Sequence, residues 1–483
     1  MFRSREPKGQ EINDEKTVSQ AVASVQDEET IGQQDRLQPA VADAFALREG
    51  DENQVDFKTL GWIKAGLIIT CEAIALGTLS FPSTFKRLGL AAGLITNCAF
   101  IAIAYLGAWI MVDFKLKYPH VLNAADAGRE MFGRAGYIIC GIGIVAKSVG
   151  LAASHVLAGK LAIATFDDNA NCAVGWAALI SGVSAILSYN RKWSGLLWLS
   201  VASLTCIIIA CIVTMAGAGT QPADFLVPPG GEPVHWVAFN TSVSLADCIG
   251  AITNCVFAYG QAMAVLTFLP EMKKPKDFRK SIALMQVLQL IVYSVVGGVL
   301  YTYGGQYTPS PALTMTKRTL AIISYAFALV TIIVSGIVAV NVGAKFFYTE
   351  LFRNSPMLTS NSWKAQGAWL AIIGTIYTAA FIIAELIPFF NQLLTIVSSW
   401  TSSWFVCGFA GMLWLHLYNP RLPENAGNGG WFSTPGRIVM FCIAIGLVAI
   451  SVALTPLGTY AAVKGIIDGY SSGKFDRPFS CSA

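Results

Sequence analysis

The chain has 483 residues, of which 54% are hydrophobic and 13% are charged, and its mean hydropathy is +0.56. Soluble domains carry about 25% charged residues, so this composition excludes a soluble protein and indicates an all-α polytopic membrane protein. The net charge of +4 is small and spread over the loops, and it gives no support to nucleic-acid binding.

The first 60 residues contain 13 Asp or Glu and 7 Lys or Arg, with few aromatic residues. We therefore expect residues 1–57 to form an acidic, disordered cytoplasmic tail. No apolar run follows the first residues, so no cleavable signal peptide is expected. The tail is either a plain tether or a regulatory segment with partners of its own.

The first apolar stretch, residues 62–87, is long enough to cross a bilayer but contains its own interruption. Gly77, Thr78 and Ser80 lie near its centre, Pro82 follows, and Glu72 lies about one turn before. Lipid requires every backbone group to find a partner within the protein, so a helix that stops in mid-membrane must be buried or line a cavity. Such interruptions form the substrate sites of secondary transporters.

Hydropathy and length predict about eleven membrane spans. They lie near residues 62–85, 92–113, 136–160, 172–189, 193–217, 243–269, 282–303, 319–347, 366–388, 392–418 and 436–461. A transporter domain over residues 58–465 and a short extracellular tail at 466–483 follow from this count.

The short loops set the orientation. With the amino terminus inside, the cytoplasmic loops hold 16 Lys or Arg and the opposite loops hold 5, Lys160 among them. An odd number of spans then places the carboxyl terminus outside. The loop at 218–242 has no Lys or Arg and contains a glycosylation sequon at Asn240, which this topology places outside.

The sixth span carries a second interruption at Tyr259, Gly260 and Gln261. It follows the first span by five, so the two interrupted helices run in opposite directions. Antiparallel broken helices at corresponding places are typical of a five-plus-five inverted repeat, here with one extra helix.

Four segments carry a resemblance to a known family. They are EAIALGTLSFPSTFKRLG at 72–89, FAYGQ at 257–261, EMKKPKDFRKS at 271–281 and IPFFNQLL at 387–394. Together they resemble the amino acid/auxin permease family, in the form of its fungal neutral amino acid permeases, over roughly residues 58–461. The resemblance implies the inverted fold of the amino acid–polyamine–organocation group and uptake of neutral amino acids, usually with protons.

The interrupted helices provide a candidate substrate site. The N–H groups after the first break lie at the positive end of a half-helix, which suits the binding of an amino acid carboxylate. Carbonyls freed near both breaks suit the ammonium group, and Phe257 and Tyr259 are candidates for the side-chain pocket. The expected binding residues are Ala75, Gly77, Thr78, Leu79, Ser80, Phe257, Ala258, Tyr259 and Gly260.

We single out four ionisable residues within the predicted spans, where a charge is costly. Asp247 and Glu385 lie near the outer ends of their helices, and we interpret both as interfacial. Glu72 and Lys147 are deeper, and they are either a structural pair or the carriers of a coupled proton. Two other sets of residues are alternative candidates for ion coupling. His155, near the outer boundary, is a weaker candidate for proton relay. Thr331 and Ser335 suit a sodium site by family analogy, although membrane Ser and Thr usually bond their own backbone.

Most of the eleven cysteines lie inside apolar spans, and there they are expected to be small packing residues rather than a disulfide framework. No CxxC, HxxxH or HExxH pattern occurs, so neither a metal site nor an organic cofactor is expected. No nucleophile–base constellation and no charged pore ring is visible, which argues against an enzyme and a channel.

The sequence therefore predicts a secondary transporter that imports neutral amino acids, aliphatic or aromatic, by proton symport across the plasma membrane. Its partners are the amino acid and the lipid bilayer. Three alternatives stay open: sodium coupling, a sensor on the same fold that binds substrate without moving it, and location in a vacuolar or other internal membrane.

Overall fold

The computed structural model describes residues 58–168, 170–222, 224–260, 262–353, 355–425, 429–472 and 478–481. The predicted acidic tail, residues 1–57, lies outside these ranges. The described residues are helical and contain no strand, and one isolated bridge joins Leu60 to Met272.

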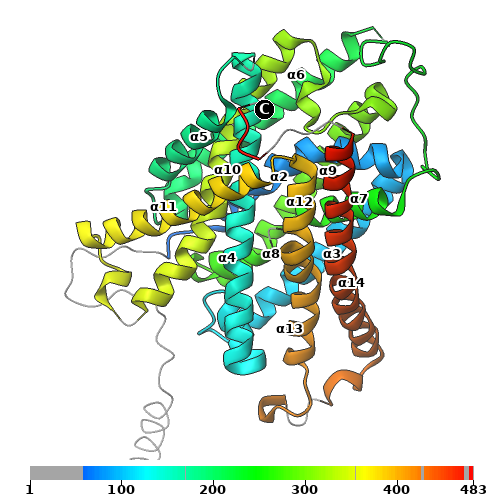
Figure 1. Cartoon of the computed structure of the whole chain (residues 1–483). Helices are drawn as coiled ribbons and strands as arrows, with labels where there is room; N and C mark the ends of the chain where they lie inside the picture. The colour runs from blue at the N-terminus through cyan, green and yellow to red at the C-terminus, as the bar shows by residue number, and fades with distance from the viewer. Residues whose placement is uncertain are drawn as a thin grey trace, which may run out of the picture. The chain divides into compact units, whose positions relative to one another are not determined.

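The membrane domain consists of helices connected by short loops (Figure 1). The α-helices are α2 (Trp62–Leu88), α3 (Leu90–Lys117), α4 (Ala124–Asp167), α5 (Ala173–Leu187), α6 (Leu197–Thr220), α7 (Leu245–Ala258), α8 (Ala262–Phe268), α9 (Phe278–Gly304), α10 (Arg318–Phe352), α11 (Trp363–Leu386), α12 (Phe390–Val397), α13 (Phe409–Leu417) and α14 (Pro435–Ser471). Two π-helical stretches, Ser398–Ser402 and Trp404–Gly408, join α12 to α13.

Eight described helical segments are long and apolar enough to cross a membrane, or nine when the bent α2 is counted. The short α5 occupies the place of the predicted fourth span, and the interrupted pair α7–α8 that of the sixth. The predicted all-α polytopic class is therefore confirmed. Several helices run past the predicted spans: α4 begins at Ala124, α10 continues to Phe352, and α14 continues to Ser471. In α4 and α10 the additional turns carry polar residues that find partners.

The first and sixth spans run antiparallel, as predicted. Leu60, before α2, accepts from the amide of Lys273 beyond the end of α8, at 3.0 Å. At the opposite side, Leu88 at the end of α2 accepts from the amide of Asn240 before α7, at 2.9 Å. The start of α2 therefore lies beside the end of α8, and the end of α2 lies beside the start of α7.

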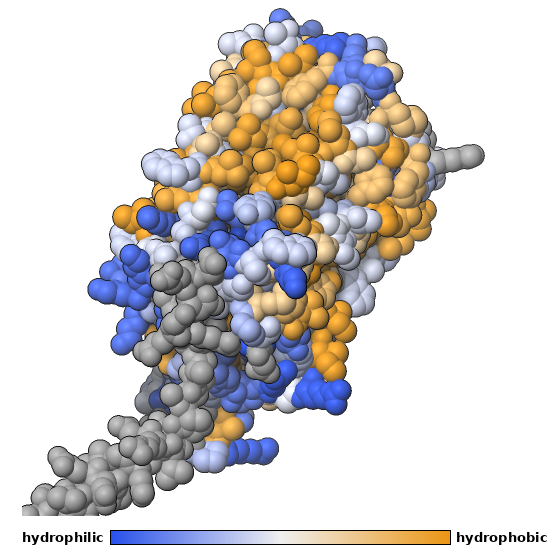
Figure 2. All heavy atoms as spheres, turned by 90° about the vertical axis from the view of Figure 1, so that its left-hand side faces the viewer, coloured by the Kyte–Doolittle hydropathy of each residue, from blue (hydrophilic) through white to orange (hydrophobic). Residues whose placement is uncertain are grey.

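The interior is formed around α2, which packs against α7, α9 and α10 and is buried along most of its length. The surface that faces lipid is apolar. Figure 2 shows one such face, where hydrophobic side chains form a broad zone with hydrophilic side chains gathered beside it. Exposed Ile and Leu side chains of α5 and α11, such as Ile186 at 74% and Ile382 at 44%, suit contact with hydrocarbon.

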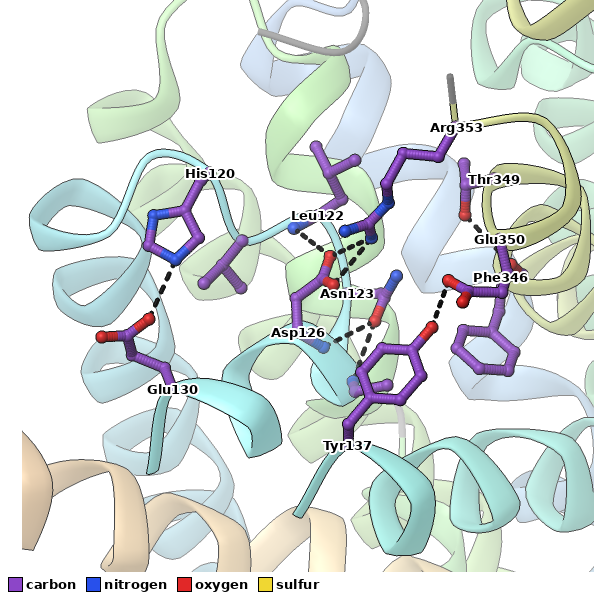
Figure 3. A network of polar contacts seen from close by, with 12 residues as sticks. His120, Leu122, Asn123, Asp126, Glu130, Tyr137, Phe346, Thr349, Glu350 and Arg353 are labelled. Atoms are coloured by element: carbon purple, nitrogen blue, oxygen red, sulfur yellow. Dashed lines mark hydrogen bonds and ion pairs between the residues drawn. The ribbon is translucent and has the colours of Figure 1, made fainter. Parts of the chain in front are cut away.

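Helix α4 is kinked near its inner end. Phe132 and Gly133 leave the helical conformation, and Gly133 adopts a φ of +63°, which a side chain would disfavour. A polar network holds the segment before the kink (Figure 3): the Arg353 guanidinium donates to both oxygens of Asp126 at 2.7 and 2.9 Å, and Tyr137 donates to Glu350. These contacts fasten α4 to the inner end of α10.

Candidate functional site

The first predicted interruption is a bend. Helix α2 turns by 48° between Trp62–Ala75 and Gly77–Leu88 while remaining helical on both sides. Side chains of other helices bond the carbonyls just before the bend. The Tyr293 hydroxyl of α9 donates to Ala73, and the Ser335 hydroxyl of α10 donates to Cys71 at 2.8 Å.

The second interruption is a true helix end. α7 ends at Ala258, and the amide of Gly260 donates to the Phe257 carbonyl at 2.9 Å in a tight turn before α8. The carbonyl of Ala258 accepts from the Gln289 amide of α9 at 3.0 Å. Helix α9 therefore supports both interruptions through Tyr293 and Gln289. The carbonyls that we expected to be free for a substrate ammonium, those of Ala73 and Ala258, already have one donor each.

A cavity lies between the two interruptions and α4. Its lining residues are Glu72, Ala73, Gly77, Lys147, Leu151, His155, Phe257, Ala258 and Gly260. Its volume is about 10 Å³, room for about one water molecule, so the site is nearly closed in this conformation. Three segments far apart in sequence thus meet at one point, and they include both predicted proton-coupling candidates.

Four of the nine expected binding residues line this cavity, namely Gly77, Phe257, Ala258 and Gly260. The lining does not include Ala75, Thr78, Leu79, Ser80 or Tyr259. The Thr78 hydroxyl donates to the Ile74 carbonyl, and the Ser80 hydroxyl to the Gly77 carbonyl at 3.1 Å, so both stay within α2.

Tyr259 was expected beside the pocket but faces the opposite way. Its hydroxyl donates to Asn97 of α3, and its ring meets Phe81 edge-on with centroids 6.5 Å apart. Phe81 in turn stacks on Tyr293 at 4.4 Å. This aromatic cluster fills the space behind the bend of α2, and Phe257 is left as the aromatic residue of the cavity wall.

The polar groups of the cavity are unevenly satisfied. The Lys147 ammonium donates to the Ser402 hydroxyl of the π-helical stretch at 2.8 Å. Among the described residues, Glu72 Oε2 and His155 Nε2 have no hydrogen-bond partner. His155 Nδ1 lies 2.8 Å from the Leu151 carbonyl, so Nδ1 carries the hydrogen and Nε2 is left as an acceptor in the neutral ring. His155 is 3% exposed and lines this cavity together with Glu72 and Lys147.

Thr331 and Ser335 do not bond their own helix. Thr331 donates to the Ser203 carbonyl of α6 at 2.7 Å, and Ser335 donates to Cys71 of α2 as above. The Cys71 sulfur and the Ser203 hydroxyl lie 3.0 Å apart. These hydroxyls join α10 to α2 and α6, and a sodium ion there stays a prediction.

Glu385 lies near the end of α11, as expected, but its side chain is not exposed. Its carboxylate is fully buried and pairs with Lys160 of α4, with Nζ 3.0 Å from both oxygens. Lys160, which we had counted in a loop, is 2% exposed. This pair fastens α11 to α4. The corresponding expectation for Asp247 holds, since its side chain is 55% exposed and lies 3.8 Å from Arg87.

A second buried ion pair lies on the side of the protein that the loop charges predict to be cytoplasmic, and the sequence did not indicate it. Glu271, just beyond α8, pairs with Lys345 of α10, whose ammonium lies 3.9 Å from the ring centroid of Trp193. The Glu271 carboxylate also accepts from the Trp193 amide at 3.3 Å, and its carbonyl accepts from the Leu60 amide at 3.1 Å. Four segments therefore meet at Glu271. The sequence signal that could have indicated this pair is Glu271 itself, the acidic residue at the start of the 271–281 motif.

The structure contains one disulfide that the sequence did not predict, between two cysteines outside the apolar helices. Cys172, before α5, is bonded to Cys481, 309 residues later. The amide of Ala173 also donates to the Cys481 carbonyl at 3.0 Å. A disulfide persists in an oxidising compartment, so this face agrees with the side that the loop charges predict to be outside.

Comparison with known proteins agrees with this geometry. Residues 58–457 match the family described as transmembrane amino acid transporter protein. The chain is 32% identical over 441 residues to the N amino acid transport system protein of Neurospora crassa, covering 90% of this chain and 91% of that one. It is 22% identical to a transmembrane transporter of Gibberella moniliformis, with 89% and 88% covered.

Two solved structures share the fold at low sequence identity. MhsT in complex with L-phenylalanine gives a TM-score of 0.55 at 14% identity, covering 83% of this chain and 98% of that one. A Na⁺-coupled sialic acid symporter in a substrate-bound outward-open state gives 0.54 at 14% identity, with 87% and 94% covered. The chain belongs to the transmembrane amino acid transporter family, and it is a multi-pass transporter of amino acids rather than an enzyme.

Proposed function

We propose that this protein imports neutral amino acids by proton symport. The observation that carries the proposal is the cavity where the bend of α2, the end of α7 and the polar face of α4 meet. It holds one carboxylate, Glu72, and one ammonium, Lys147, beside the helix interruptions. A zwitterionic amino acid also carries one charge of each sign, so its charges can pair with those of the cavity. An amino acid with a cationic or anionic side chain would bring one more charge, which would have no partner in this buried site.

Each end of the substrate has a candidate partner. The carboxylate suits the Lys147 ammonium and the helix that begins at Gly77, whose positive dipole end faces the cavity. The ammonium suits His155 Nε2 and Glu72 Oε2, two buried acceptors that lack a partner among the described residues. Phe257 provides an apolar wall for the substrate side chain.

Coupling follows from the two opposite charges. When Glu72 takes up a proton, Lys147 becomes the uncompensated charge of the cavity and attracts the substrate carboxylate. When the proton leaves, the Glu72 carboxylate competes for Lys147 and the substrate is released. Because the cavity volume is about 10 Å³, an amino acid enters only after α2 or α8 moves away from α4.

Uptake by proteoliposomes tests the proposal. One proton with one zwitterion carries a net positive charge inward, so 100 mV supplies about 2.3 kcal/mol, or roughly 50-fold accumulation. Labelled neutral amino acids should accumulate with an inside-negative potential, accumulate further when the outside is acidified, and leak out with a protonophore. Uptake that ignores pH and follows sodium would overturn proton coupling.

Sodium coupling has one specific observation in its favour. The Ser335 hydroxyl lies at the Cys71 carbonyl near the bend of α2. The Thr331 hydroxyl lies one helical turn earlier on α10, at the Ser203 carbonyl of α6. Hard cations such as sodium prefer oxygen ligands of this kind. Thr331→Ala with Ser335→Ala should remove sodium-dependent uptake if this candidate is correct, and should leave the pH dependence unchanged if protons drive transport.

Import also requires an orientation, which we infer from the loop charges and from the disulfide. Placement of Cys172–Cys481 on the outer side puts the amino terminus in the cytoplasm. We place the protein in the plasma membrane, and an internal membrane whose lumen is oxidising is the alternative. Fluorescence of a tagged chain in its own cell distinguishes the two.

A further inference from the structure

A large apolar groove lies on the membrane-facing side of α4, opposite the substrate cavity. Its volume is about 650 Å³, within the range of roughly 300–1,000 Å³ of small-molecule sites. Residues from α4 and from the α12–α13 region line it: Phe132, Ala135, Gly136, Ile139, Cys140, Ile142, Gly143, Ala146, Trp400, Thr401, Trp404, Phe405, Phe409 and Met412. Figure 1 shows these two helical columns side by side.

The sequence explains why a groove forms here. The α4 side is built from small residues that leave space, among them Ala135, Gly136 and Ala146. The opposite wall consists of aromatic residues from the two π-helical stretches, such as Trp400 and Trp404. The straight part of α4 begins after the kink at Gly133, so the kink marks one end of the groove. The polar network of Figure 3 connects this region of α4 to α10.

The groove is open to the hydrocarbon of the bilayer. Ile139, Ile142 and Trp400 in its lining are 68%, 64% and 60% exposed. The hydroxyl of its one Thr, Thr401, donates to the Val397 carbonyl at 2.6 Å, and the Trp404 indole N–H donates to the Thr455 hydroxyl at 3.0 Å, so these two polar groups do not compete with an apolar ligand. Along α4, Ala135 to Ala146 spans about 17 Å at 1.5 Å per residue. This length is close to the roughly 15 Å of hydrocarbon in one leaflet.

A positive charge lies at the inner end of the groove. Arg134 is exposed and stands between Phe132 and Ala135 in the sequence, on the side that the loop charges mark as cytoplasmic. Arg recognises phosphate by bidentate hydrogen bonds. We propose that the groove binds one acyl chain of an acidic phospholipid of the inner leaflet, with the lipid phosphate at Arg134.

The groove and the substrate cavity share one wall. Ala146 lines the groove and the next residue, Lys147, lines the cavity. Likewise Thr401 lines the groove, and the next residue, Ser402, accepts the Lys147 hydrogen bond at 2.8 Å. A bound chain therefore supports the contact that positions Lys147, and transport depends on the lipid. This last step rests on the proposed function, whereas lipid binding does not.

Lipid retention tests binding directly. The full-length protein is exchanged into vesicles of phosphatidylcholine, phosphatidylglycerol and sterol, extracted in mild detergent, and weighed intact by mass spectrometry. The wild type should keep one phosphatidylglycerol. Ala146→Phe, which fills the groove, should lose it at least tenfold, and Arg134→Gln should retain phosphatidylglycerol and phosphatidylcholine equally.

The matched control is Ala371→Phe, an exposed position of α11 outside the groove, which should retain lipid as the wild type does. Equal retention by Ala146→Phe and the control would overturn the proposal, and so would retention of the sterol in place of the phospholipid.

Uptake in vesicles with and without phosphatidylglycerol tests the link to transport. The wild type should be several-fold faster with phosphatidylglycerol, and Arg134→Gln should lose this difference. If the lipid is retained and uptake is equal in both vesicles, the link to Lys147 is wrong. If no variant transports any amino acid, the proposed function fails, while the retention result stands by itself.

Discussion

Three buried polar side chains decide the chemistry of the site. Glu72, Lys147 and His155 come from two helices and meet at one small cavity. Lys147 has the Ser402 hydroxyl as a partner, whereas an oxygen of Glu72 and a nitrogen of His155 have none among the described residues. Buried polar groups without partners are costly, and we propose that these mark the place where a substrate or a proton binds.

Glu72→Gln should flatten the dependence of uptake on outside pH and preserve exchange of substrate for substrate. The amide retains the shape of the side chain but cannot take up or release the proton. Uptake and exchange are measured in proteoliposomes from pH 5 to 8.

The control is Glu385→Gln, which breaks the buried pair with Lys160 outside the cavity lining and should reduce the amount of folded protein without changing the pH profile. If Glu72 is only a structural partner of Lys147, Glu72→Gln should instead lower the folded yield, and Lys147→Met should partly restore it. That result would remove the proton role from Glu72.

Gly77→Ala should impair transport, because Gly77 lies where α2 packs closely against α9. In the structure a Cβ at this position would collide with the Tyr293 hydroxyl and lie 3.2 Å from Ala258 Cβ. The bend of α2 would have to move away from α9, which supports it.

Tyr293→Phe removes the colliding oxygen but keeps the ring carbon Cζ, 2.7 Å from the added Cβ, so it should restore uptake to the Gly77→Ala variant only in part. Gly374→Ala in α11 is the control, because nothing lies within 4 Å of its added Cβ. Surface expression and uptake are measured for each variant. Full uptake by Gly77→Ala would show that the close approach of α2 and α9 is not required.

At the scale of helices, the two interrupted spans are held by side chains of their neighbours. α9 bonds carbonyls of both through Tyr293 and Gln289, and α10 bonds α2 through Ser335. The inner ends are held by the pair of Glu271 and Lys345. Alternating access requires contacts that break and re-form, and this pair joins the end of the sixth span to α10.

Glu271→Gln should open the inner side and destabilise the protein. Removing one partner of a buried pair leaves the other charge unpaired, at a cost of about 3–5 kcal/mol. A cysteine placed at Ala258 should then react faster with a reagent added from the cytoplasmic side, and thermal unfolding should occur at lower temperature.

The double variant Glu271→Gln with Lys345→Met leaves no buried charge and should regain stability while the inner side stays more accessible. Cysteine reactivity equal to that of the wild type in both variants would show that the pair does not close the inner side.

At the scale of the whole molecule, one disulfide provides a test of the predicted orientation in the membrane. Cys172 and Cys481 lie 309 residues apart and join the loop before α5 to the far end of the chain. Cys481→Ser should leave Cys172 free and reactive toward a membrane-impermeant thiol reagent added outside. Cys98 and Cys442, exposed within apolar spans, should remain unlabelled. Labelling from the cytoplasmic side alone would reverse the topology.

Asn240 gives a second measure of the same orientation. The residue is half-buried, and its side-chain amide donates to the Lys86 carbonyl at 3.4 Å, so glycosylation stays a prediction. Asn240→Gln should increase electrophoretic mobility if the sequon is used, and unchanged mobility would show that it is not.

The sequence by itself determined what depends on local composition. Apolar length gave the spans, because the bilayer sets the thickness that each helix must cross. Gly77 and the Tyr259–Gly260 pair marked the bend and the helix end, because glycine and polar neighbours weaken a helix where they stand. The family and the antiparallel relation of the broken helices followed from motifs and from counting spans.

Only the tertiary structure decided which side chains meet. The sequence places a residue at a height in the membrane, but the rotation of each helix about its axis depends on packing with helices hundreds of residues away. That rotation turned Tyr259 away from the cavity and His155 into its lining. It also paired Lys160 with Glu385 and Lys345 with Glu271, residues that the sequence assigned to loops or membrane boundaries.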